Sequence, residues 1–516
     1  MIRVRIKRAF PAHPLMSSST APRLTVTHWL IIIIASIGFL FDTYELLMTP
    51  LVAAPAIAEL LKVPQNNPLV TDWVGRLLWI AALCGGVFGL IGGWLVDKLG
   101  RKTVMALSIF VYSLSPFCAA YAPSLTVFII FRCTTFIGVC VEFVAAITWL
   151  AEVFEDGKQR EKWLGITQAF ASLGGVLVTV ISIWISAHGK DLPHMGLPLG
   201  LGSTDPGSWR YLLMTGLLPA IPIALLLPFV PESRVWKEKR AAGTLKRPSF
   251  GALFAPELRR VTLVTAILSA CAYGIAFGAL QVTVARVTPG LPELKPQAGQ
   301  LAPLRKEAEL LNTQLNEMIK RDAPIAEQKP LRDQIKANFV KQKPINDVVK
   351  EKADQVQFRQ EMGGLIGRIL LAVLLIVGLS RVALLKVFQI PALIILPLTY
   401  FKLFAGGGEL FLWSYFVCGL VTVAQFSYFG EYLPKVFPLH LRGTGGSFAT
   451  NVGGRMIGTS MATLNTSWLA PLLAGGAQAV KPMHVALAAG YIATAMAVIA
   501  FVLGFLLPEP KEQAAE

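Results

Sequence analysis

The sequence predicts an all-α polytopic membrane protein with about 12 transmembrane helices, and three observations lead to this prediction. Of the 516 residues, 54% are hydrophobic and only 15% are charged, which is too apolar for an ordinary soluble protein. Apolar stretches of about 20 residues, the length that crosses a bilayer, recur along the chain. The net charge of +16 comes mostly from short basic loops and tails beside these stretches, which indicates membrane topology and no binding of nucleic acid.

Each predicted span is an apolar run bounded by polar or turn-forming residues. The twelve spans cover 28–56, 70–96, 102–122, 124–151, 162–187, 210–230, 260–287, 363–380, 383–404, 409–433, 445–473 and 483–507. Lys and Arg gather before the first span and then in every second loop, so both termini are expected in the cytoplasm. We expect an integral protein of a bacterial inner membrane.

Similar spacings in the two halves of the chain indicate an internal repeat. Glu152 precedes Gly174 by 22 residues, and Glu431 precedes Gly453 by 22 residues. This pattern predicts two pseudo-symmetric six-helix bundles, although Gly-rich helices can also align by chance. The predicted divisions are a tail at 1–27, a bundle at 28–230, a connector at 231–259, span seven at 260–287, an insertion at 288–362, spans eight to twelve at 363–507 and a tail at 508–516.

The insertion at 288–362 is polar, and span parity places it on the extracytoplasmic side. It contains an apolar stripe with alternating spacings of four and three, formed by Leu304, Ala308, Leu311, Leu315 and Met318. Pro324, Pro330 and Pro344 are expected to divide the rest into shorter pieces, with 345–361 helical. We expect a small helical hairpin; a disordered loop and a docking module for another protein are the alternatives.

Two carboxylates lie near the middle of the first span. Asp42 and Glu45 are three residues apart and therefore share one helix face. Ionisable groups inside a bilayer are costly, so each is a functional candidate by default, and close carboxylates favour proton uptake. The sequence therefore predicts proton coupling through Asp42 and Glu45, with a static ion pair to a basic residue as the alternative.

The fourth span supplies Arg132 and Glu142, about 15 Å apart along a helix. Arg132 can bind a substrate carboxylate with two hydrogen bonds, and Glu142 can share the proton with Asp42; an arginine that only holds helices together is the alternative. Arg76 is a second candidate anion ligand. Three further polar residues are candidate cavity groups, namely Gln168, Gln281 and Asn451.

Motifs for enzymatic or ATP-driven chemistry are missing from the sequence. It has no P-loop, no metal-binding pair of histidines and no Gly-x-Ser-x-Gly motif. We therefore expect neither an enzyme nor a metal site, and no cofactor: a proton gradient is the expected driving force. The expected partners are a small-molecule substrate and the lipid bilayer, but no nucleic acid.

Several motifs occur together in one order along the chain. Gly92-Gly93-Trp94-Leu95-Val96-Asp97-Lys98-Leu99-Gly100-Arg101-Lys102 follows the second span, and Arg132, Gly138 and Glu152 mark the fourth. Val230-Pro231-Glu232-Ser233-Arg234 ends the sixth span, and Leu441-Arg442-Gly443-Thr444-Gly445 with Asn451-Val452-Gly453-Gly454-Arg455 follows the tenth. This set resembles the major facilitator superfamily over nearly all of the chain except the tails and the insertion.

The resemblance implies two six-helix bundles that rock about a central site. Within the superfamily, the acid pair in span one and the Leu-Arg-Gly-Thr-Gly loop look most like proton symporters of aromatic acids and sialate and their sugar-porter relatives. This implies alternating access and proton-coupled symport of a small organic anion or sugar-like solute. A proton-driven antiporter that exports organic cations, bound directly by acids such as Asp42, and a non-cycling receptor are the alternatives.

The resemblance also implies a gating or conformational role for a set of motif residues. They are Gly93, Asp97, Gly100, Arg101, Glu152, Arg160, Glu431, Arg442 and Arg455. Asp97 is expected to contact the second bundle when the cytoplasmic side is closed, within a network that includes Arg455. By spacing, Arg381 corresponds to Arg101 in the second half, and Val377 stands where Asp97 does.

Overall fold

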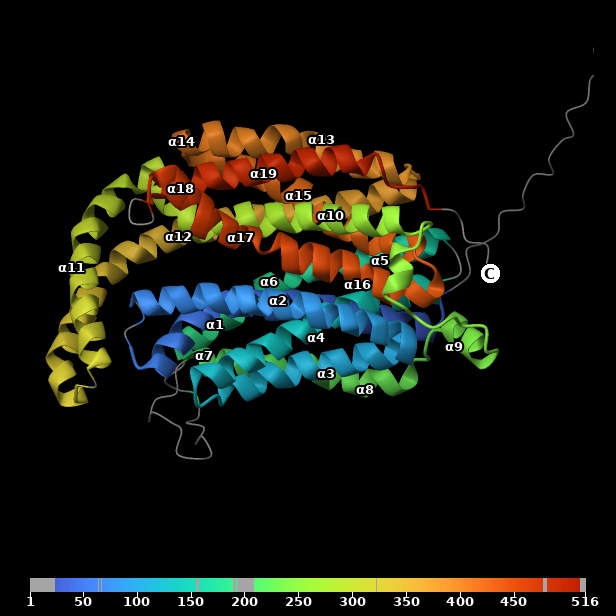
Figure 1. Ribbon diagram of the computed structural model, residues 1–516, viewed down its shortest axis with the longest axis horizontal. Helices are drawn as coiled ribbons and strands as arrows, with labels where there is room; N and C mark the ends of the chain where they lie inside the picture. The colour runs from blue at the N-terminus through green and yellow to red at the C-terminus, as the bar shows by residue number, and fades with distance from the viewer. Residues whose placement is uncertain are drawn as a thin grey trace, which may run out of the picture.

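The computed structural model describes residues 24–63, 65, 67–154, 157–188, 192, 208–321, 323–476 and 480–510. The helices form two layers, with the first half of the chain in one and the second half in the other (Figure 1). The insertion lies at one end of the layers and the connector helix α9 (Arg234–Ala241) at the opposite end. We call these the insertion end and the Asp97 end. The tail segments 1–23 and 511–516 lie outside the described residues.

The first half contains six predicted spans. They are formed by α1 (Val26–Leu61), α2 (Pro68–Leu99), α3 (Arg101–Ala120), α4 (Leu125–Val153), α5 (Gly157–Ala169) with α6 (Ala171–His188), and α7 (Ser208–Met214) with η1 (Thr215–Leu217), α8 (Ala220–Leu226) and η2 (Leu227–Phe229). Side-chain caps begin several of these helices: Thr25 for α1, Asn67 for α2 and Ser124 for α4. Capping satisfies backbone N–H groups that have no partner inside the helix.

The second half repeats this arrangement around the insertion. Its spans are formed by α10 (Arg259–Ile275) with η4 (Ala276–Gln281) and η5 (Thr283–Val287), the end of α12 (Ile325–Val377), α13 (Arg381–Leu398) with η8 (Thr399–Leu403) and α14 (Phe404–Gly406), α15 (Gly408–Val436), the segments from α16 (Arg442–Ser447) to α18 (Ala470–Ala474), and α19 (Pro482–Gly504). Each half has its own buried apolar clusters.

Span eleven is not one regular helix. Within the described residues, eleven helices are long and apolar enough to cross a membrane, and the predicted span 445–473 is not among them. Between α16 and α18 the chain forms η10 (Phe448–Gly458), α17 (Met461–Thr463) and η11 (Leu464–Leu469), and η10 and η11 are π-helical. π-Helical turns are frequent at functional sites. Span eleven therefore consists of α-helical segments separated by wider π-helical turns. The overall fold is still the predicted twelve-helix fold.

The insertion is helical, but its boundaries differ from the prediction. It consists of η6 (Thr288–Gly290), η7 (Pro292–Leu294), α11 (Lys295–Lys320) and the first part of α12, which form a hairpin. Asn338 on α12 donates hydrogen bonds to the Leu304 carbonyl, at 3.1 Å, and to the Glu307 carboxylate, at 2.9 Å, on α11. The expected breaks at Pro330 and Pro344 are wrong, because both prolines lie inside α12. Packing against α11 offsets the backbone hydrogen bonds that these prolines remove.

Close backbone approach joins α12 to α15 within the second half. A Cβ atom on Gly367 would lie 2.3 Å from the Leu420 carbonyl oxygen, and one on Gly363 would lie 1.9 Å from that of Phe416. Small residues at a spacing of four allow helices to approach closely within a membrane. The two glycines therefore fix the distance between α12 and α15.

We predict that Gly367→Ala lowers the free energy of unfolding by about 1–3 kcal/mol, because the added methyl group meets backbone that cannot rotate away. Gly299→Ala is the matched control, since nothing lies within 4 Å of a Cβ at that position of α11. It should be neutral or stabilising by roughly 0.5–1 kcal/mol. Thermal unfolding in detergent measures both, and equal midpoints for the two variants would contradict the packing argument.

Candidate functional site: a charged cavity between the two halves

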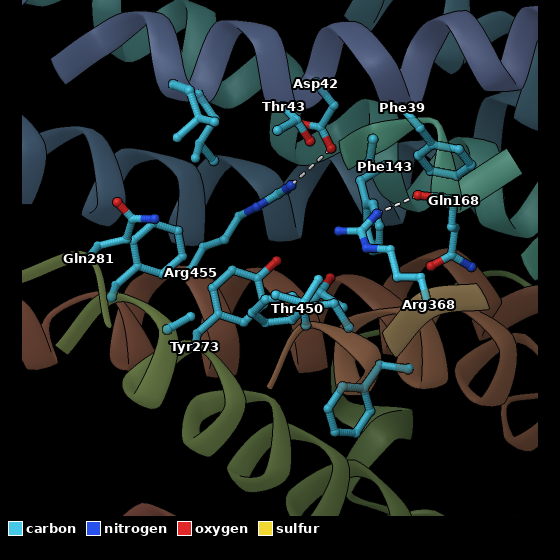
Figure 2. Close-up of a pocket in the computed structure, with 18 of the residues that line it drawn as sticks. Phe39, Asp42, Thr43, Phe143, Gln168, Tyr273, Gln281, Arg368, Thr450 and Arg455 are labelled. Carbon is cyan, nitrogen blue, oxygen red and sulfur yellow. Dashed lines mark hydrogen bonds and ion pairs between the residues drawn. The ribbon is translucent and has the colours of Figure 1, made fainter. Parts of the chain in front are cut away.

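A cavity lies between the two halves and is lined by residues from both of them. Its wall combines aromatic side chains with a few charged and amide groups (Figure 2). The aromatic residues are Phe39, Phe143, Tyr273, Phe277, Phe426 and Phe429; the charged ones are Asp42, Glu361, Arg368 and Arg455; the amides are Gln168, Gln281 and Gln360. A mostly apolar cavity with few convergent polar groups is the usual form of a small-molecule site.

The central contact in the cavity is an ion pair between the halves. Arg455 Nη2 on η10 lies 3.4 Å from Asp42 Oδ2 on α1, and both side chains are almost fully buried (Figure 2). Asn451, one turn earlier on η10, accepts a hydrogen bond from Arg455 Nη1 at 3.0 Å. Asn451 also donates to the Cys140 carbonyl of α4 at 3.1 Å. The π-helical turn thus brings Arg455 across the interface, where Asn451 holds it.

A second guanidinium enters the cavity wall from α12. Arg368 donates a hydrogen bond to the backbone carbonyl of Gln168 in span five (Figure 2). Span five is interrupted at Phe170, between α5 and α6, so the Gln168 carbonyl lies at a helix end. Carbonyls at helix ends need outside donors, and Arg368 supplies one from the other half. The cavity therefore contains two arginines that both contact the first half.

The predicted amide residues divide into two groups. Gln168 and Gln281 line the cavity, as does Asp42. Asn451 is fully buried in the interface behind Arg455 and is not among the lining residues. Arg76 lies on an exposed face of α2 and pairs with Asp72 at 2.9 Å, so its proposed role as an anion ligand of the cavity is not supported by its position.

Arg132 is also placed outside the cavity. Its Nη1 atom lies 3.7 Å from Glu45 Oε2, and its Nη2 atom donates to the Glu45 carbonyl at 3.2 Å and to the Thr49 hydroxyl. Both side chains are buried inside the first half. The predicted binding of a substrate carboxylate by Arg132 is not supported by this position: the guanidinium contacts Glu45 and links α4 to α1. Although Glu45 is only three residues from Asp42, its carboxylate pairs with Arg132 and does not line the cavity.

Glu142 is a buried carboxyl on α4 with no hydrogen-bond partner among the described residues. A Cβ atom on Gly38 would lie 2.3 Å from Glu142 Oε1, so the carboxyl packs against α1. Gly38 and Asp42 are four residues apart on one helix face. Glu142 therefore lies behind the Asp42–Arg455 pair, near it but outside the cavity wall.

At the Asp97 end, a compact polar cluster joins the halves. Asp97 accepts hydrogen bonds from the backbone N–H of Gly443, at 2.9 Å, and from the N–H and hydroxyl of Thr444, both at 2.7 Å. Arg101 Nη2 lies 3.5 Å from Asp97 Oδ1 and 2.9 Å from Glu152 Oε1. The side chains of Asp97, Arg101 and Glu152 are fully buried. We call these residues, with Gly443 and Thr444, the Asp97 cluster.

Further predicted gating residues surround the Asp97 cluster. Arg442 Nη1 reaches Glu152 Oε1 at 3.3 Å across the interface. A Cβ atom on Gly93 would lie 2.3 Å from the Ser447 Cβ atom, so only glycine allows this approach. Gly100 has a φ of 110°, a left-handed conformation that favours glycine. Arg160 lies half-buried in the first turns of α5, and Glu431 pairs with Arg381 at 3.3 Å within the second half.

Arg455 does not belong to the Asp97 cluster. The resemblance placed it in the same network as Asp97, but the structure pairs it with Asp42 in the cavity. Sequence reasoning also missed Glu361 and Tyr273 as cavity residues. The ionisable residues within apolar spans gave a usable signal for Arg455 and Arg368, but periodicity alone does not tell which helix face meets the other half.

The Arg132–Glu45 pair yields a stability prediction. Arg132→Ala leaves the Glu45 carboxylate buried without its counter-charge, which should cost about 3–5 kcal/mol of unfolding free energy. Arg76→Ala is the control, because its pair with Asp72 is more than half exposed and should contribute less than about 1 kcal/mol. Thermal unfolding in detergent compares the two, and a similar small loss in both variants would show that the buried pair is not structural.

Curated proteins that are similar to this chain include two that are named as transporters. The chain is 27% identical over 206 residues to the niacin transporter NiaP of Acinetobacter baylyi, covering 40% of this chain and 41% of the relative. It is 23% identical over 244 residues to the sialic acid transporter NanX of Escherichia coli, covering 46% of this chain and 52% of the relative. The matched part therefore spans about half or less of the length of these relatives.

Solved structures show the same fold along almost the whole chain. The E. coli proton:xylose symporter XylE aligns with a TM-score of 0.65 at 17% identity, covering 94% of this chain and 96% of that chain. The E. coli fucose:proton symporter FucP in the outward conformation aligns with a TM-score of 0.61 at 16% identity, covering 93% and 98%.

A family model adds the decisive match. The model described as Major Facilitator Superfamily matches residues 29–299, which is more than half of the 516-residue chain. The twelve-helix fold and the interface motifs agree with this match. The protein is therefore an integral membrane protein that belongs to the major facilitator superfamily.

Proposed function

We propose that the protein is a proton-coupled symporter that accumulates a small organic anion by alternating access. The observation that carries this proposal is the ion pair between Asp42 and Arg455, which joins the two halves inside the cavity. Protonation of Asp42 removes its charge and frees Arg455 to bind a substrate carboxylate. The proton and the anion would thus replace one internal ion pair by another.

The formal charge of the cavity supports an anion as cargo. Two acids, Asp42 and Glu361, and two guanidinium groups, Arg368 and Arg455, line it. One proton and one monoanion bound together leave the sum of charges unchanged, which avoids an uncompensated charge in a low-dielectric site. A cation would instead meet two arginines whose charge cannot be removed. This argues for anion symport over the export of organic cations.

The apolar wall supports a substrate with a planar or apolar body. Six aromatic side chains surround the charged groups, and aromatic rings favour stacked or edge-to-face contacts with other rings. Relatives of the chain carry the names niacin transporter and benzoate transport protein. A sugar-like solute fits less of this wall, because its hydroxyl groups would need partners that phenylalanine does not offer.

The proposed orientation places the Asp97 end in the cytoplasm of a bacterial cell, with the insertion outside. Basic residues flank the loops at the Asp97 end, as the positive-inside rule requires. In this orientation the Asp97 cluster closes the cytoplasmic side of the cavity. The backbone N–H groups of Gly443 and Thr444 are satisfied by Asp97 only while that side is closed.

Uptake into proteoliposomes tests the proposal directly. Vesicles with an imposed proton gradient, acidic outside, are given radiolabelled nicotinate, benzoate, xylose or tetraphenylphosphonium in separate assays. Accumulation of an anion that a protonophore abolishes is the expected result. Transport of tetraphenylphosphonium alone would replace the proposal by cation export, and uptake of xylose alone would replace the anion by a sugar.

We predict that Asp42→Asn abolishes proton-driven accumulation but retains exchange of labelled for unlabelled substrate across the membrane. The amide is neutral like the protonated acid, so Arg455 stays available for substrate while the proton cannot be released. Asp72→Asn is the control, because Asp72 is exposed on α2 and pairs only with Arg76 among the contacts described. Continued accumulation against a gradient in Asp42→Asn would remove Asp42 from coupling, and loss of exchange as well would indicate a binding or folding role.

We predict that Asp97→Ala opens the Asp97 end more often, because three hydrogen-bond donors of the second half lose their acceptor. The probe is a cysteine at Ser447, which is buried in the interface, in a protein whose six native cysteines are replaced. Hydrogen bonds to charged groups each contribute about 1.5–3 kcal/mol, so thiol labelling should accelerate by roughly tenfold or more. Glu238→Ala, at an exposed ion pair of α9, should leave the labelling rate unchanged. Equal rates in both variants would show that Asp97 does not hold this end closed.

A further inference from the structure

The insertion belongs to the second half by sequence but contacts the first half. Asn67 Nδ2, at the start of α2, donates to Asn316 Oδ1 on α11 at 3.0 Å. Arg332 Nη1 on α12 donates to the Lys62 carbonyl, at the end of α1, at 2.6 Å. Ile319 packs against the apolar cluster of the first half that contains Val63. Three separate contacts therefore bridge the two halves at the insertion end.

The base of the insertion is fixed to the second half. Glu293 pairs with Lys352 of α12 at 3.1 Å and accepts a hydrogen bond from the N–H of Gly408, the first residue of α15, at 3.2 Å. Burial opposes the charged form of Glu293, but these hydrogen bonds and the lysine charge hold its pKa below the ordinary value. The hairpin is thus anchored on one half, while its far end, seen beside α1 and α2 at the edge of Figure 1, rests on the other.

The same helix that makes the bridge also lines the cavity. α12 is one helix from Ile325 to Val377, so Arg332 at the bridge and Gln360, Glu361 and Arg368 at the cavity belong to a single element. Contacts with α15 through Gly363 and Gly367 hold this helix to the second half. Movement of the first half away from the insertion therefore changes the surroundings of both the bridge and Arg368.

We propose that the insertion is a gate that closes the cavity at the insertion end by bridging the two halves. In this state its contacts with Lys62 and Asn67 are made, and they must break before solute can enter or leave the cavity at that end. The polar groups of the bridge are two neutral amide side chains, one backbone carbonyl and one arginine, and the hydrogen bond of the arginine is exposed. Water can replace such partners, which makes the bridge reversible. The gate goes beyond the proposed symport, because any substrate that uses this end must pass it.

A disulfide across the bridge tests the gate. Asn67→Cys and Asn316→Cys are combined in a protein without the six native cysteines, with a protease site inserted at Gly243, where nothing lies within 4 Å of a Cβ. After cleavage, the two fragments run together on a denaturing, non-reducing gel only if the disulfide has formed. A third cysteine at Gln281, in the cavity wall, reports access through its labelling by a membrane-impermeant maleimide, added to the intact protein after the bridging pair is oxidised.

The expected result is that oxidation slows labelling at position 281 by about tenfold or more, and that reduction of the disulfide restores it. Leu304→Cys with Asn338→Cys is the control pair, because it links α11 to α12 inside the hairpin and should leave labelling unchanged. Unchanged labelling with the 67–316 disulfide formed would overturn the gate. Equal slowing by both disulfides would also overturn it, since stiffening of the hairpin would then suffice.

This labelling requires no transported substrate, so failure of the symport proposal and failure of the gate are distinguishable. Where nicotinate or benzoate is transported, the 67–316 disulfide should also abolish its uptake, and reduction should recover it. Undiminished uptake with the disulfide formed would contradict the gate even if the symport proposal holds. Docking of another protein on the insertion remains a separate prediction.

Discussion

Buried charge is the constraint on which the structure depends. An ionised side chain inside a membrane bundle is costly unless an opposite charge or hydrogen-bond donors meet it. In this chain, several of the partners lie in the opposite half: Asp42 meets Arg455 in the cavity, and Asp97 meets the N–H groups of Gly443 and Thr444. Separation of the halves therefore exposes unpaired groups, and each group needs a new partner in the other state.

Corresponding residues of the two halves make similar contacts, except at the position of Asp97. Glu232 accepts hydrogen bonds from the backbone N–H of Arg101 at the start of α3, and Glu509 does the same for Arg381 at the start of α13. Arg101 pairs with Glu152, and Arg381 pairs with Glu431. Only the first half adds an acid, because Val377 occupies the place that spacing assigns to Asp97 and is largely exposed. The contact across the interface at this end is accordingly asymmetric.

Sequence patterns predicted the fold well because span length and loop charge depend on local composition. The twelve spans and the helical insertion follow from apolar runs and heptad spacing. The sequence did not predict that α12 is uninterrupted, because a proline such as Pro344 usually breaks a helix. In the structure, α12 packs against α11 in the hairpin and stays helical through Pro344. The π-helical turns of span eleven were missed for a similar reason: their hydrogen bonds shift with packing against other helices and leave no composition signal.

The sequence predicted only some of the residues that line the cavity, and the differences between prediction and structure have one common cause. Intramembrane charge singled out both Asp42, which lines the cavity, and Arg132, which does not. Which acid meets which arginine depends on helix rotation and on the approach of two halves that are far apart in sequence. Glu45 pairs with Arg132 within the first half, whereas Asp42 pairs with Arg455, which lies more than 400 residues away in the sequence. Local spacing carries no information about that choice.

In the symport that we propose, the position of the Asp42–Arg455 pair relates proton coupling to conformational change. It lies between the Asp97 cluster at one end and the bridge of the insertion at the other, and it is itself a contact between the halves. A proton on Asp42 weakens this contact, whereas an anion between Arg455 and the first half would renew it. A proton without a substrate would thus leave Arg455 buried without a counter-charge, and a substrate without a proton would place two anions beside one guanidinium. Both partly loaded states are penalised, which is the physical requirement for tight coupling.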